Sequence, residues 1–180
     1  MASSLCPWVA LVVLVVLVQG GLGIAFTKVI SVENGGPWGD WGDAEFCPED
    51  TYATGFQLKV GPGWGDGGTG GGQHGGDGSL IWGSWTYPLS CGRSQRLVSF
   101  RLRVEAPRGL WDDTAANNLD ITCSDGTVLE GQGGPAGVWG NWSASCPFGW
   151  GICGLQTRVE PPQRGGDDTG LNDVKFFCCT

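Results

Sequence analysis

A short acidic motif, D-D-T-x-x-N, occurs twice in this 180-residue chain and holds the residues best suited to chemistry. Its carboxylates are Asp112, Asp113, Asp167 and Asp168, and its asparagines are Asn117 and Asn172. Paired carboxylates can act as acid and base on glycosidic bonds, contact sugars, or supply oxygen ligands to calcium. The same side chains also cap backbone N–H groups in turns between strands. The recurrence favours the structural turn, and the four carboxylates are candidate glycan contacts.

No other arrangement in the sequence indicates catalysis. Ser-His-Asp, Cys-His and phosphate-loop constellations cannot be assembled, so we assign no catalytic residue and expect no cofactor. A zinc site would be the rival explanation for the cysteines. The chain has no C-x-x-C pair and a single histidine, His74, so we also expect no metal site.

Tryptophan pairs of the form W-G-x-W occur three times. They are Trp38 with Trp41, Trp82 with Trp85, and Trp139 with Trp142. Tryptophan faces stack on sugar rings, yet large rings at repeated positions more often build core and strand-end packing. We therefore place at least one tryptophan of each pair in the core. Asn141 lies within the last pair and, with Ser143, forms an N-glycosylation sequon.

These motifs belong to a repeated unit. Cys91 and Cys146 are 55 positions apart, and the same interval separates Phe100 from Leu155 and Cys123 from Cys178. Such gapless agreement indicates internal duplication. An earlier copy is spaced by 44 from the second, so it is about eleven residues shorter. The repeats span about residues 27–78, 79–133 and 134–180, and the first is truncated after Val60, where a glycine-rich tract follows.

Within each copy, apolar and polar residues alternate. Phe100, Leu102 and Val104 are separated by Arg101 and Arg103. This period of two predicts strands of an antiparallel sheet with one buried face. We expect an all-β fold in which three such sheets pack about a pseudo-threefold axis, as a β-prism.

The cysteines predict a disulfide framework. Seven remain after residue 25, and an extracellular chain with this number forms disulfides. The repeat pairs Cys91 with Cys123, and Cys146 with either Cys178 or Cys179, which leaves the other of these two for Cys153. Cys47 then has no counterpart, and we expect it to be unpaired, as a free thiol or an intermolecular bridge.

The compartment follows from the N-terminus. Residues 1–25 contain an apolar run followed by small residues, which is typical of a cleaved secretory signal peptide, and residues 26–180 then form one secreted domain. The formal charge of −8 argues against nucleic acid and anionic membrane surfaces as partners. We expect a secreted, extracellular protein that does not associate with membranes after signal cleavage.

Several segments closely resemble the vitelline membrane outer layer protein 1 family. They are G-G-P-W-G-D-W at 35–41, F-R-L-R-V-E-A-P at 100–107, D-D-T-A-A-N-N at 112–118, C-G-L-Q-T at 153–157 and the C-C-T terminus. The resemblance covers nearly all of the chain after residue 25. It implies a secreted β-prism of three Greek-key sheets pinned by disulfides, similar to jacalin-like lectins. This chain departs from the family by lacking the second half of the first copy, including a cysteine.

The resemblance also bears on function. The avian egg member of the family is a structural protein of the outer egg envelope, and transfer activity on N-acetylglucosamine oligomers has been attributed to the family. We therefore expect a disulfide-stabilised structural protein of an extracellular coat or secreted fluid, with glycans or coat proteins as candidate partners. The alternative is a glycan-active enzyme that transfers N-acetylglucosamine units.

Overall fold

The computed structural model describes residues 28–60, 84–105, 116–160 and 170–180, and these residues contain strands, turns and loops but no helix. The strands are β1 Lys28–Ile30, β2 Asp40–Trp41, β3 Glu45–Phe46, β4 Gly55–Phe56, β5 Lys59–Val60, β6 Ser84–Trp85, β7 Leu89–Ser90, β8 Leu97–Val104, β9 Ala116–Cys123, β10 Val128–Glu130, β11 Val138–Trp139, β12 Gly151–Val159 and β13 Leu171–Cys179. The all-β prediction is confirmed. The described segments also contain no helix long and apolar enough to span a membrane.

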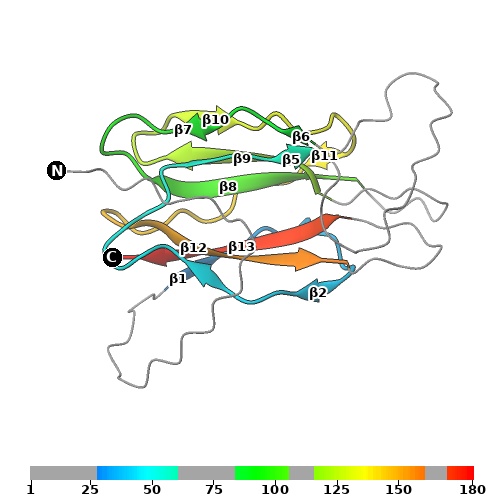
Figure 1. Ribbon diagram of the computed structural model, residues 1–180, viewed down its shortest axis with the longest axis horizontal. Coiled ribbons are helices and arrows are strands. Elements are labelled where there is room, and N and C mark those ends of the chain that lie inside the picture. Colours follow the sequence, from blue (N-terminus) through cyan, green and yellow to red (C-terminus); the bar gives the residue numbers. More distant parts are fainter. Residues whose placement is uncertain (1–27, 61–83, 106–115, 161–169) are drawn as a thin grey trace, which may run out of the picture.

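Two larger sheets form the body of the described structure. One has the order β1-β13-β12-β2, with β3 also paired to β12, and the other has the order β10-β9-β8-β11. Figure 1 shows them as two layers, with the β8–β9 hairpin above the β12–β13 hairpin. The strands β4 with β7 and β5 with β6 form two short ladders. Because the described strands form two larger sheets and two ladders, the β-prism of three Greek-key sheets stays a prediction.

The core lies between the two larger sheets. Phe100 and Leu102 are fully buried, while Arg101 between them is only half-buried, as the alternation in the sequence predicts. The ring of Phe100 meets the edge of Phe176 from the opposite sheet at a centroid distance of 4.8 Å. Each buried phenylalanine of this kind contributes about 2–3 kcal/mol through apolar burial. The buried side chains between the layers come mainly from β8 and β9 on one side and β13 on the other, with Ile30 of β1 and Ile152 of β12 beside them.

The two long hairpins pair in the same register. Phe100 faces Ile121 across β8 and β9, and Leu155 faces Phe176 across β12 and β13. Each number in the second pair exceeds its counterpart by 55, the interval found in the sequence. Both hairpins also contain register irregularities near their ends, so they match in their distortions as well as in their pairs.

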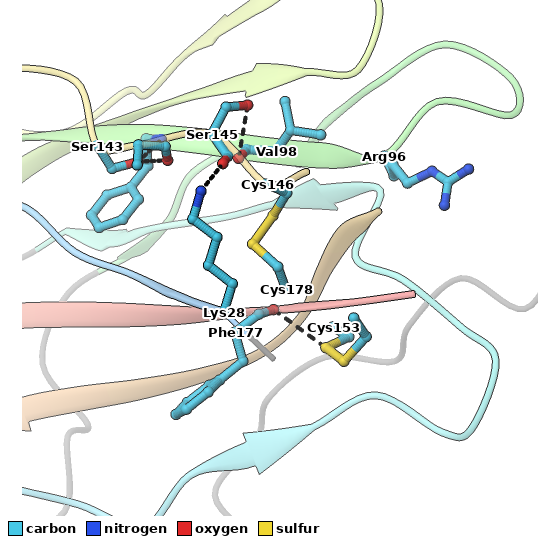
Figure 2. The surroundings of a disulfide bond; sticks show 12 residues. Lys28, Arg96, Val98, Ser143, Ser145, Cys146, Cys153, Phe177 and Cys178 are labelled. Carbon is cyan, nitrogen blue, oxygen red and sulfur yellow. Dashed lines mark hydrogen bonds between the residues drawn. A yellow bond between two sulfur atoms is a disulfide. The ribbon is translucent and has the colours of Figure 1, made fainter. Parts of the chain in front are cut away.

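Three disulfides join pairs of described cysteines. They are Cys91–Cys123, Cys146–Cys178 and Cys153–Cys179. The first is the predicted pair, and the second and third settle the choice between Cys178 and Cys179. Figure 2 shows Cys146 beside β8 and Cys178 on β13, so this bond ties one sheet to the other. Lys28 of β1 adds a second tie by donating to the Ser145 carbonyl at 2.8 Å.

The prediction that Cys47 is unpaired is wrong in this structure. Cys47 is disulfide-bonded, and its partner lies outside the described residues. The prediction considered only the seven cysteines after residue 25, and the whole sequence contains eight.

Candidate functional site

The four candidate carboxylates lie outside the described residues. They are Asp112, Asp113, Asp167 and Asp168. The asparagines that close the motifs are described. The carbonyl of Asn117 accepts from the Gly134 N–H at 2.8 Å, and the carbonyl of Asn172 accepts from the Gly36 N–H at 2.7 Å. These are main-chain bonds at equivalent places in the two copies, so both motifs end beside the same kind of glycine turn.

That turn reveals which tryptophans are equivalent. Trp41 faces Arg158, Trp85 faces Lys59 and Trp139 faces Arg103 in the strand pairing. Trp41 and Trp85 are the second members of their W-G-x-W pairs, whereas Trp139 is the first member of its pair. The shared signal is G-G-P-x-G-x-W, which occurs at 35–41 and again at 133–139. Alignment of the copies by the W-G-x-W motif does not pair Trp139 with Trp41.

The glycine two residues before the tryptophan explains why the turn can form. Gly39 and Gly137 have φ angles of 79° and 85°, which side chains other than glycine rarely adopt. A Cβ at Gly137 would also lie 2.4 Å from the Val104 carbonyl group. The carbonyls of the two glycines also accept hydrogen bonds. The Gly39 carbonyl accepts from Arg158 Nε at 2.8 Å, and the Gly137 carbonyl accepts from Arg103 Nε at 3.0 Å.

A cation lies beside each of the three equivalent tryptophans. The distances from the cationic group to the ring centroid are 3.9 Å for Lys175 and Trp41, 5.8 Å for Lys59 and Trp85, and 4.5 Å for Arg101 and Trp139. Contacts within about 6 Å are stabilising cation–π interactions. We call these three pairs the tryptophan–cation rows.

The row at Trp139 is the most elaborate. The Arg101 guanidinium lies 4.5 Å from the Trp139 ring centroid and 5.0 Å from that of Trp142. It also donates from Nε and Nη2 to Asp120 Oδ2 at 3.0 and 2.8 Å. The Asp120 side chain is 2% exposed, and its Oδ1 accepts from the Gly131 N–H at 3.0 Å. This row is therefore a rigid, charge-balanced unit.

The row at Trp85 is the most open. Trp85 is 55% exposed and Tyr87 is 81% exposed. Between them, Thr86 is fixed to Leu58: its N–H donates to the Leu58 carbonyl at 2.8 Å and its Oγ1 accepts from the Leu58 N–H at 3.1 Å. Trp85 is the last residue of β6, and Tyr87 follows it by two positions. We call Lys59, Trp85 and Tyr87 the Trp85 face.

These surfaces differ in what they can do chemically. The Trp85 face offers two aromatic side chains and one ammonium group, which suits stacking on a sugar ring with a polar contact at its edge. The row at Trp139 keeps its cation balanced by a carboxylate and offers less. The described residues contain no cluster of three or more histidine, cysteine, aspartate or glutamate side chains that could hold a metal ion.

One carboxylate near the row at Trp41 has a shifted pKa. Partial burial raises the pKa of Asp173, and the Val174 N–H, Lys175 and Arg158 oppose the rise. Asp173 Oδ1 accepts from that N–H at 2.8 Å. The corresponding residue of the other hairpin is Asn118, whose Oδ1 accepts from the Leu119 N–H at 2.9 Å and the Gly133 N–H at 3.0 Å. The position therefore binds backbone rather than a substrate.

Comparison with known proteins places the chain in a family. The family model described as vitelline membrane outer layer protein I matches residues 28–71 and 73–180. The chain is similar to the vitelline membrane outer layer protein 1 homologs of Homo sapiens and Mus musculus, with 46% and 42% identity over 171 residues. Each alignment covers 86% of this chain and 84% of the relative. The chain therefore belongs to the vitelline membrane outer layer protein I family.

Proposed function

We propose that this protein is a secreted structural component of an extracellular coat or secreted fluid. The observation that carries the proposal is the disulfide framework, because disulfides persist in oxidising compartments outside the cytosol. The Cys146–Cys178 bond joins the two larger sheets, and the two other described bonds fasten strand ends. The names of the human and mouse relatives point to an extracellular layer. The predicted signal peptide, residues 1–25, would deliver the chain there.

We further propose that the whole chain completes a β-prism with a pseudo-threefold axis. The support is the pairing of Trp41 with Arg158, Trp85 with Lys59 and Trp139 with Arg103, which repeats one local geometry in three places. The first copy is shortened after Val60, and it supplies two-residue strands where the other copies supply strands of eight and nine residues.

A glycan-binding role for the Trp85 face is the second part of the proposal. Two exposed aromatic residues two positions apart can provide a stacking platform, and Lys59 lies over the Trp85 ring. Oligomers of N-acetylglucosamine suit such a platform, because their rings have apolar faces and their amides accept hydrogen bonds.

The test uses the full chain expressed in secreting eukaryotic cells. We expect disulfide-bonded protein in the medium, and we expect it to bind immobilised N-acetylglucosamine oligomers. The Trp85→Ala/Tyr87→Ala variant should lose at least tenfold in affinity. The Phe148→Ala variant is the matched control, because Phe148 is a fully exposed aromatic residue elsewhere.

Incubation with the same oligomers also separates binding from turnover. Product formation that disappears in Asp113→Asn or Asp168→Asn would overturn the structural assignment and favour the glycan-active enzyme. Protein retained inside the cells would count against secretion.

A further inference from the structure

The loop between β11 and β12 displays a single asparagine to solvent. Asn141-Trp142-Ser143 is the one N-x-S/T sequence in the 180 residues. Asn141 is exposed, and the chain is fastened to β8 on both sides of it. The Gly140 N–H donates to the Leu102 carbonyl at 2.9 Å, and the Ser143 N–H donates to the Phe100 carbonyl at 2.7 Å. The two residues between these anchors are held at the surface.

The position of Asn141 matches that of Tyr87. Each follows the paired tryptophan of its row by two residues, Asn141 after Trp139 and Tyr87 after Trp85. Both are exposed. A group attached to Asn141 would therefore be anchored two residues from Trp139, as Tyr87 is two residues from Trp85.

Trp142 provides a surface for such a group. Its ring centroid lies 5.0 Å from the Arg101 guanidinium, which is itself held by Asp120. Although this contact fixes the ring, Trp142 remains 39% exposed. A fixed aromatic ring next to a modified asparagine can pack against the apolar face of the first sugar.

We infer that Asn141 carries an N-linked glycan whose first N-acetylglucosamine packs against Trp142. The inference rests on the secretion proposed above. Asn141 Nδ2 forms a bond to C1 of a lipid-pyrophosphate-linked oligosaccharide. The bond between C1 and the phosphate oxygen breaks, the lipid pyrophosphate leaves, and the amide loses one proton. The glycan covers the row at Trp139 and leaves the Trp85 face as the open aromatic surface.

Intact-mass measurement of the secreted full chain tests the attachment. Peptide N-glycosidase should remove one glycan and convert Asn141 to aspartate. The Asn141→Gln variant should lack the glycan, and Ser143→Thr should keep it. Ser143→Ala is avoided because Ser143 Oγ also accepts from the Phe100 N–H at 3.1 Å. Secreted wild-type protein without a glycan would overturn the inference and leave secretion intact. Chain retained in the cells is digested in the same way: a shifted mass supports attachment, and an unshifted mass overturns it.

A thermal measurement tests the contact with Trp142. Native deglycosylation should lower the unfolding temperature of the wild type by about 2–3 °C. The Trp142→Ala variant should lose this shift, whereas Trp38→Ala should keep it, because Trp38 is an exposed tryptophan of another pair. An equal shift in wild type and Trp142→Ala would rule out the contact.

Discussion

Removing the carboxylate of Asp120 should destabilise the fold through one buried ion pair. In the Asp120→Ala variant, Arg101 loses both bonds to Oδ2 and the Gly131 N–H loses its acceptor. Breaking a buried pair costs about 3–5 kcal/mol when one charge is left behind. The Arg101 side chain is 30% exposed, so water compensates part of the loss and the lower end applies. We expect a decrease of about 3 kcal/mol in the free energy of unfolding.

A double-mutant cycle separates the interaction energy between Arg101 and Asp120 from the cost of changing each residue alone. Arg101→Ala should also cost about 3 kcal/mol, because it leaves Asp120 buried without its cation. The double variant should cost about 4 kcal/mol, which gives a coupling energy of about 2 kcal/mol. The other hairpin carries Gln156 and Lys175 at the same register, so the backbone there does not require this pair.

Denaturant unfolding with intact disulfides measures these values. Glu130→Ala is the matched control, because Glu130 faces Asp120 from β10 and is exposed. Its change should stay within about 0.5 kcal/mol. A cost below about 1 kcal/mol for Asp120→Ala, or a coupling energy below about 0.5 kcal/mol, would refute the reasoning.

Three further changes probe the turns, the titration and the disulfides. Gly137→Ala should cost about 3 kcal/mol in denaturant unfolding, and Gly126→Ala about 1 kcal/mol, since both have positive φ but only a Cβ at Gly137 meets other atoms. Burial raises the pKa of Asp173, so stability should fall as pH rises from 3.8 through the native pKa. Asp173→Asn should therefore be more stable than wild type at pH 7 but not at pH 3, and the opposite order would contradict the burial argument. Replacing Cys146 and Cys178 by serine opens a bond spanning 32 positions. It should cost about 3–4 kcal/mol, and a thermal shift under 3 °C would show that the unfolded chain is not restrained by this bond.

The strands and disulfides were predictable because their signals are local or regular. The alternation from Phe100 to Val104 predicts that one face of the strand is buried, and this holds for any partner strand. The interval of 55 predicts that residues paired in one hairpin have equivalents paired in the next. Neither signal requires knowledge of the connecting loops.

The contacts of the candidate site were not predictable in the same way. Arg101 and Asp120 meet because β8 and β9 pair across register irregularities at both ends, and sequence spacing does not reveal where these fall. The equivalence of Trp139 with Trp41 was hidden because the repeated W-G-x-W text lies two residues nearer the following cysteine in the third copy. Tyr87 belongs to no motif, and only its exposure in the folded chain identifies it.

The sheet that contains β12 and β13 has one consequence for synthesis. Its outer strands, β1 and β2, come from the beginning of the described chain, and its central strands come from the last thirty residues. A nascent chain emerging from the ribosome cannot complete this sheet until its final strand is available. The N-terminal strands must therefore wait, unpaired, through translation, and contacts of such high sequence separation form slowly. Loss of the last ten residues would remove β13, one of the two central strands of this sheet.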